Sequence, residues 1–132
     1  DAFQADYERI SNCLTAATGI KPLYYRFPGG STEVTEKLQM TDLDAYFNAQ
    51  GASYFDWNVI AANNTTDDVS VNKMVDSVMN GVALYDTSIV LMYDSVDRKM
   101  TAKSLDSILD YLLKNGYEIL PIDENTIPIH HS

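Results

Sequence analysis

Hydrophobic residues recur along this 132-residue chain at two different spacings. Steps of three and four residues predict amphipathic helices, because such positions share one face of an α-helix. The first of these stripes contains Phe3, Tyr7, Ile10 and Leu14. The predicted helices cover residues 2–17, 31–50, 70–82 and 105–113.

Short apolar and aromatic runs between these helices predict strands. The predicted strands cover residues 23–27, 53–59, 88–93 and 117–120. The third is almost entirely apolar in its middle, as expected of a strand that is buried on both faces. Because strands and helices alternate with short turns, the strands should pair in parallel through right-handed crossovers. The sequence therefore predicts one α/β domain over residues 1–132.

Turn and capping residues indicate where the helices begin and end. Ser31 is a candidate N-cap for the second helix, and Asp68 or Ser70 for the third. The polar run 63–68 predicts the loop before that third helix. Glycines, which favour the left-handed conformation that commonly ends a helix, follow three of the predicted helices: Gly19, Gly51 and Gly116.

The chain is strongly acidic, with a formal net charge of −10. This charge excludes nucleic acids and anionic membranes as partners, since both are bound largely through clustered Lys and Arg. No stretch approaches the roughly 20 apolar residues that a membrane span needs. The single cysteine, Cys13, cannot form an intramolecular disulfide, and we expect it to be buried in the first helix.

Candidate site residues follow or end three of the predicted strands. Parallel strands direct their carboxyl ends to one edge, where α/β proteins place ligand-binding and catalytic groups. The candidates are Tyr25, Arg26, Phe27, Pro28, Gly29 and Gly30 at the first strand, Asp56, Trp57 and Asn58 at the second, and Tyr93 and Asp94 at the third.

These same segments carry a family resemblance. Residues 24–31 read Tyr-Tyr-Arg-Phe-Pro-Gly-Gly-Ser, residues 54–59 read Tyr-Phe-Asp-Trp-Asn-Val, and residues 89–95 read Ile-Val-Leu-Met-Tyr-Asp-Ser. In this order they resemble the third, fourth and fifth motifs of the polysaccharide deacetylases, the NodB homology group of carbohydrate esterase family 4. Residues 112–122 resemble that family's closing helix and strand. The resemblance implies a partial (β/α) barrel with about four parallel strands alternating with helices.

The resemblance also implies a chemistry, the metal-assisted removal of acetyl groups from glycans such as peptidoglycan or chitin. In that family a divalent metal such as zinc is held by an aspartate and two histidines, which belong to the first two motifs together with a catalytic base. Those motifs have no counterpart in this sequence. The two histidines present, His130 and His131, are adjacent in a C-terminal tail, and we interpret them as surface residues. We therefore predict no metal site and no cofactor in this chain.

Two of the retained motifs depart from the family pattern. Tyr93 occupies the place of the family's acid histidine, and a phenol with an ordinary pKa near ~10 donates a proton poorly at neutral pH. Ile60 occupies the place of an aspartate that orients the third-motif arginine, and Asn63 replaces a further acidic residue. Arg26 must then pair with another carboxylate or with water if it is buried.

The candidate residues have a functional and a structural interpretation. Arg26, Tyr93 and Asp94 occupy catalytic positions of the family in altered surroundings, and we favour the structural interpretation for each of them. Gly29 and Gly30 can form a tight turn or offer backbone N–H groups to an acetyl or sugar oxygen. The predicted glycan-binding positions are Tyr25, Phe27, Pro28, Gly29, Gly30, Trp57 and Asn58, although for Trp57 we favour a core position.

The sequence leads to a deacetylase-like protein that is inactive by itself. Two alternatives remain: half of a divided or truncated metal-dependent hydrolase that needs its upstream segment, and a glycan-binding or structural accessory domain. An unrelated flavodoxin-like or receiver module is disfavoured, because no phosphate-binding glycine loop follows a first strand. Two unpaired strand edges would favour pairing with a missing amino-terminal half or a second copy. The family resemblance implies an extracellular or cell-envelope location.

Overall fold

The computed structural model describes residues 2–33, 40–62 and 69–131 and divides the chain into two compact units. Unit 1 consists of Asp1–Asp56 and His130–Ser132, and unit 2 consists of Trp57–Ile129. The C-terminal tail therefore returns to the unit in which the chain begins. The single-domain organisation stays a prediction. Among the described residues, the helices are too short or too polar to cross a membrane.

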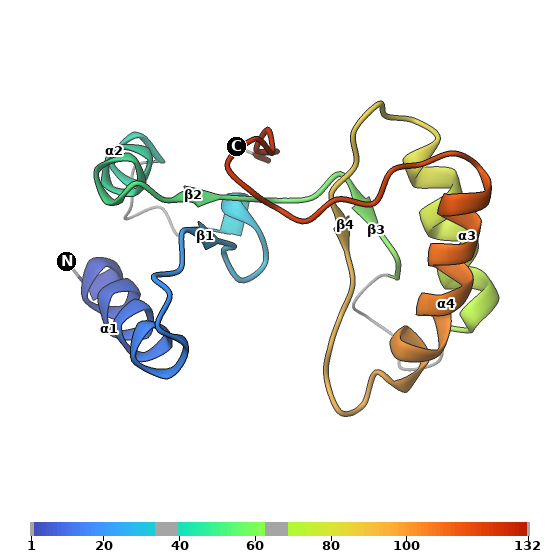
Figure 1. Cartoon of the computed structure of the whole chain (residues 1–132), viewed down its shortest axis with the longest axis horizontal. Helices are drawn as coiled ribbons and strands as arrows, with labels where there is room; N and C mark the ends of the chain where they lie inside the picture. The colour runs from blue at the N-terminus through green and yellow to red at the C-terminus, as the bar shows by residue number, and fades with distance from the viewer. Residues whose placement is uncertain (1, 34–39, 63–68, 132) are drawn as a thin grey trace. The chain divides into compact units, whose positions relative to one another are not determined.

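Unit 1 places two helices and a 3-10 turn around a short parallel strand pair (Figure 1). In β1 and β2, Tyr24 lies opposite Ser53 and Tyr25 opposite Tyr54. The elements of this unit are α1 (Ala2–Thr18), β1 (Tyr24–Tyr25), the 3-10 helix η1 (Ser31–Glu33), α2 (Met40–Gln50) and β2 (Ser53–Tyr54).

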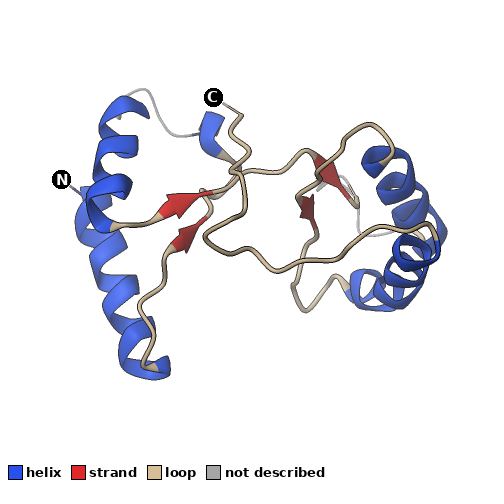
Figure 2. Cartoon of the chain, turned by 45° about the horizontal axis from the view of Figure 1, so that its top comes forward, coloured by secondary structure: helices blue, strands red, loops and turns tan. Residues whose placement is uncertain are grey.

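Unit 2 is a second parallel strand pair with two helices that lie side by side, as both views show (Figure 2). Val59 lies opposite Val90 and Ile60 opposite Leu91, so β3 and β4 run in the same direction. The elements of this unit are β3 (Val59–Ile60), α3 (Val71–Val82), β4 (Val90–Leu91) and α4 (Lys99–Lys114).

The helix ends follow the predicted capping glycines, but the start of the second helix does not follow the prediction. Ser31 begins the 3-10 helix η1 and α2 begins at Met40, so the prediction of Ser31 as the N-cap of this helix was wrong. Gly19, Gly51 and Gly116 have positive φ angles of 75°, 65° and 79°, which confirms them as helix-ending positions. Ser70 is the N-cap of α3, where its side chain accepts a hydrogen bond from the Lys73 amide. The alternative cap Asp68 and the loop 63–68 lie outside the described residues.

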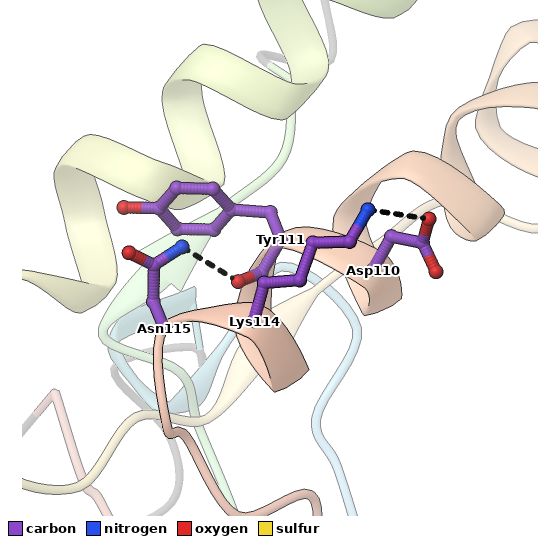
Figure 3. A network of polar contacts seen from close by, with 4 residues as sticks. All are labelled: Asp110, Tyr111, Lys114 and Asn115. Atoms are coloured by element: carbon purple, nitrogen blue, oxygen red, sulfur yellow. Dashed lines mark hydrogen bonds and ion pairs between the residues drawn. The ribbon is translucent and has the colours of Figure 1, made fainter.

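The C-terminal end of α4 is closed by polar contacts (Figure 3). The Asn115 side-chain amide donates to the Tyr111 carbonyl oxygen over 2.8 Å, and the same carbonyl also accepts from the Asn115 backbone amide over 3.0 Å. One turn earlier, Lys114 Nζ lies 3.2 Å from Asp110 Oδ2. Both residues of this ion pair are exposed, so its stabilising effect is small.

The strand predictions need two corrections. Residues 53–59 do not form one strand, because β2 and β3 are separate and pair with different neighbours, β1 and β4. Residues 117–120 form no strand: Leu120 is 69% exposed, and only Tyr117 packs against the core of unit 2. A strand needs a backbone partner along its length, and its apolar sequence alone cannot supply one.

The two units have cores of different composition. Unit 1 is aromatic: its core cluster consists of the buried residues Tyr7, Phe27, Leu43, Phe47, Ala52 and Tyr54, with Phe3, Tyr25 and Tyr46 packed against them. Unit 2 is aliphatic: its core cluster consists of the buried residues Val59, Ala61, Val78, Val82 and Ile108.

The stripe of α1 is only partly buried. Tyr7 reaches the core, whereas Ile10 and Leu14 are 48% and 42% exposed. Cys13 is also exposed, so the expectation that it is buried was wrong. It lies on a helix face that the described core does not cover.

Candidate functional site

The turn that follows β1 has the tight geometry expected of its glycines. Gly29 and Gly30 have φ angles of 77° and 93°, a region that other residues rarely adopt. The Gly30 amide donates to the Phe27 carbonyl oxygen over 2.9 Å, and the Gly30 carbonyl accepts from the Glu33 amide. The turn is thus closed by its own backbone.

The carboxylate of Asp56 lies at the end of the β2 segment and is 1% exposed. Its Oδ1 accepts a hydrogen bond from the Ser31 amide over 2.8 Å, and its Oδ2 accepts from the Ser31 hydroxyl and from the His131 amide. Burial by itself raises the pKa of the Asp56 carboxyl. The hydrogen bonds from Ser31 and His131, with the charge of His131, outweigh burial and hold this pKa below its ordinary value.

Ser31 therefore has a role that the sequence did not predict. It begins a 3-10 helix of three residues, and its hydroxyl donates to a carboxylate 25 positions away. The Ser31 and Gly30 amides are both engaged within the protein. These two N–H groups are consequently not available to an acetyl or sugar oxygen while the contacts persist.

The tail histidines contact the same strand end. The His130 ring stacks on the Tyr54 ring at 3.9 Å between centroids and an interplanar angle of 11°. His130 Nε2 lies 3.1 Å from the Tyr54 carbonyl oxygen. Both histidines are exposed, as expected of surface residues, but the sequence interpretation missed these contacts.

Tyr54 is fixed from several directions. Its ring lies 5.2 Å from that of Phe27 and 5.7 Å from that of Phe47, measured between centroids. Burial, then the charge of Asp44 and a hydrogen bond to it, then the charge of Asp56, raise the pKa of Tyr54 to about 12. The hydroxyl therefore stays protonated at physiological pH, and Tyr54 is part of the framework of the site.

The other third-motif residues divide into buried and exposed. Phe27 is 4% exposed and packs edge-on against Tyr25, a geometry that gives it a core role. Arg26, Pro28 and Gly29 are exposed. An exposed guanidinium retains its hydration, so Arg26 does not need the buried acidic partner that the sequence analysis considered.

The remaining candidates lie in unit 2. The Asn58 side chain donates to the Thr87 carbonyl over 3.0 Å and accepts from the Ile89 amide over 2.8 Å, which ties the start of β3 to the segment before β4. Trp57 is half-buried. Both ends of the Asn58 amide are thus engaged by backbone, an arrangement that favours a structural role.

Tyr93 is half-buried just after β4, and the Arg98 guanidinium lies 5.8 Å from the centre of its ring. This distance is within the range of a cation–π contact. Asp94 is exposed, and Ile60 is half-buried in β3. Asn63 lies outside the described residues. The structure therefore brings Ser31, Asp56 and the tail together in unit 1, and Tyr93 with Arg98 in unit 2.

The residues that the structure describes do not fit a divalent metal. In residues 2–33, 40–62 and 69–131, no group of three or more His, Cys, Asp or Glu side chains is placed to hold one. Asp56 accepts hydrogen bonds at both oxygens, and His130 Nε2 lies against a carbonyl. Within these described ranges, the donor set that such a metal needs is not assembled.

A solved structure matches nearly all of this chain. It is the catalytic domain of a peptidoglycan N-acetylglucosamine deacetylase from Eubacterium rectale, 30% identical, with a TM-score of 0.86 over 99% of this chain and 60% of that chain. The chain corresponds to part of a polysaccharide deacetylase domain. The family resemblance of the three motifs is thereby confirmed, and the described elements belong to part of that α/β fold.

Two further structures share the fold of this deacetylase-like chain. A CE4 esterase from Streptococcus mutans is 24% identical, with a TM-score of 0.72 over 84% of this chain and 49% of its own. A polysaccharide deacetylase from Bacillus cereus is 19% identical, with a TM-score of 0.74 over 94% of this chain and 59% of its own. The chain thus spans about half to three fifths of these proteins. No family model and no curated protein matches it.

Proposed function

We propose that this chain is a deacetylase-like protein that contributes part of a glycan-binding site but does not hydrolyse acetyl groups by itself. One observation carries the proposal: the described residues assemble no ligand set for the divalent metal on which this family's chemistry depends. Tyr93 strengthens it, because a phenol replaces the acid histidine. Loss of a positioned acid costs about 10²–10⁴-fold in rate.

The proposed ligand is a cell-wall glycan of the peptidoglycan or chitin type, whose N-acetyl group carries the C–N bond that relatives would hydrolyse. The Eubacterium rectale deacetylase, named for peptidoglycan N-acetylglucosamine, supports this class. Such polymers lie outside the cell membrane, so we place this chain in the envelope or outside the cell. Within unit 1, Arg26, Pro28 and Gly29 are exposed and remain candidates for glycan contact.

The structure favours one alternative, a hydrolase that becomes active with a further segment. Unit 1 has an open apolar groove of about 240 Å³ between α1 and β1. Its lining residues are Tyr7, Ile10, Ser11, Leu14, Pro22, Tyr24, Tyr25 and Arg26. Exposed apolar surface of this kind typically marks an interaction site.

The backbone of β1 points to the same alternative. The carbonyls of Leu23 and Tyr25 accept hydrogen bonds from the β2 segment. Because backbone groups alternate along a strand, those of Tyr24 are directed to the opposite edge. That edge, beside the groove, suits a further parallel strand. Extension of the strands into a (β/α) barrel, by an amino-terminal half or by a second copy, is part of this proposal.

The test is a reconstitution. The chain is mixed with the part of the Eubacterium rectale catalytic domain that it does not match, and acetate release from an N-acetylglucosamine oligomer is measured with Zn²⁺ present. We expect no release from either polypeptide alone. Release from the mixture supports the alternative, whereas glycan binding without release from any mixture supports an accessory role. Acetate release by the chain alone overturns the main proposal.

A matched pair of variants tests the groove. Leu14→Asp places a charge in the groove, and Leu84→Asp places the same charge at a residue of unit 2 that is 74% exposed. If the added segment docks in the groove, Leu14→Asp weakens its binding by about tenfold or more, since a charge is desolvated there. Leu84→Asp should leave binding unchanged. Equal behaviour of the two variants, or a dilute monomer without affinity for the added segment, counts against docking at this edge.

A further inference from the structure

We infer that Asp56 is a positioning residue that fixes two distant segments of unit 1 through one carboxylate, the turn after β1 and the end of the chain. The inference does not rest on the proposed function, because it concerns the architecture of the site and its test uses no substrate.

The first link runs from Asp56 to the turn. Asp56 Oδ1 lies 2.8 Å from the Ser31 amide, and Oδ2 accepts the Ser31 hydroxyl. Ser31 is 2% exposed and directly follows Gly30, so the position of the glycine turn depends on this pair of bonds. Hydrogen bonds to an ionised acceptor are roughly twice as strong as neutral ones.

The second link runs from Asp56 to the tail. Asp56 Oδ2 accepts the His131 amide over 2.8 Å, and the neighbouring His130 ring is then held against Tyr54. The tail residues 121–129 form no helix or strand that could hold this end in place. The contacts of His130 and His131 with the β2 segment therefore anchor the tail to unit 1.

The two links share one acceptor, the Asp56 carboxylate, so a change to this carboxylate should affect both of them. An amide at position 56 keeps one oxygen but replaces the other with an N–H donor, so it must face a donor from Ser31 or His131. A protein in which these links were independent would lose one of them and keep the other. An amide also lacks the negative charge that strengthens the hydrogen bonds of both links, so the turn and the tail should loosen together.

The test is nuclear magnetic resonance of the Asp56→Asn variant. We expect the Gly30, Ser31 and His131 amide signals to shift, and the Ser31 and His131 amides to exchange with solvent about tenfold faster or more. The His130 ring protons should also lose the displacement that stacking on Tyr54 produces. Asp76→Asn, the same change at an exposed residue of α3, should alter none of these signals.

A second variant separates the carboxylate from the tail. A chain that ends at Ile129 lacks the tail contacts but keeps Asp56 and Ser31, so the Gly30 signal should stay close to its original position. The inference is overturned if Asp56→Asn displaces the turn and leaves the His130 ring signals unchanged, or the reverse. If Asp56→Asn does not fold, the unaltered protein is titrated with acid. The Ser31 and His131 amides must then follow one common midpoint, and two different midpoints overturn the inference.

Discussion

The two units of this chain have small cores that are built from different kinds of side chain. Unit 1 packs aromatic rings together and also buries the Asp56 carboxylate, whereas the core cluster of unit 2 consists of valine, alanine and isoleucine. Aliphatic packing in unit 2 follows directly from helical periodicity. Packing in unit 1 depends on the ring geometry and on a tail distant in sequence. The motif positions that touch this tail are therefore the ones that local sequence patterns describe least well.

The largest expected effect comes from the aromatic core of unit 1. The Phe47 ring is within 6.1 Å of six other rings between centroids. Phe47→Ala should lower the free energy of unfolding by about 3–5 kcal/mol. Urea denaturation followed by near-ultraviolet circular dichroism measures it. The exposed Tyr85 is the control, since Tyr85→Ala should cost less than about 0.5 kcal/mol. A stability of Phe47→Ala equal to that of Tyr85→Ala would show that the ring cluster is not a core.

The tight approach of α3 to β3 gives the next largest effect. A Cβ atom at Gly81 would lie 2.6 Å from Cγ1 of Val59, which is too close for the two side chains to coexist without a shift. Gly81→Ala should therefore destabilise unit 2 by about 1–2 kcal/mol, although alanine favours helix. Thermal denaturation measures the change. Asn80→Ala, at an exposed position of the same helix, should be neutral or stabilising, and a stabilising Gly81→Ala would contradict the contact.

A smaller effect is expected at the start of α3. The Ser70 side chain accepts a hydrogen bond from the Lys73 amide, so Ser70→Ala should cost about 1 kcal/mol. Far-ultraviolet circular dichroism during urea denaturation would detect the loss. Ser77→Ala, an exposed change within the helix, controls for removal of a hydroxyl. Indistinguishable midpoints for the two variants would rule out the cap.

The smallest expected effect is the change in stability with pH that Asp56 produces, which does not appear at neutral pH. Because its pKa is lowered in the folded protein, its contribution to stability is complete above the unfolded value of about 4. That contribution declines as the pH falls below this value and is lost below the folded pKa. Exchange protection of the Ser31 amide should therefore fall in this acidic range before that of the unit 2 core. Simultaneous loss of protection in both units would contradict the special position of this carboxylate.

The sequence predicted where the helices end, because capping glycines are local signals. Gly19, Gly51 and Gly116 illustrate this, since each has the positive φ expected after a helix. The sequence did not predict where the second helix begins, since the predicted helix 31–50 contains the 3-10 helix Ser31–Glu33 and α2 begins at Met40. The strand 53–59 was wrong because a short apolar run does not reveal where the pairing partner changes. The predicted strand 117–120 was wrong for a related reason. A strand requires a neighbouring strand with which to form hydrogen bonds, and an apolar pattern cannot supply one.

The site was predictable only in part. The motif residues identified the turn at Gly29 and Gly30, and the glycines have the geometry that such a turn requires. The bond between Asp56 and His131 joins positions 75 residues apart, and no spacing rule connects them. One signal could have suggested the contact between Asp56 and Ser31: an Asp stands at the end of one predicted strand, and a Ser follows the glycine turn after another.

The central claim is that this chain has a deacetylase-like framework without the metal-dependent chemistry. Acetate release from an N-acetylglucosamine oligomer, measured with the purified chain alone in the presence of Zn²⁺, tests it most directly. The account predicts no release above a sample without protein. Sustained turnover that a chelator abolishes would contradict it, since the chain itself would then bind a catalytic metal.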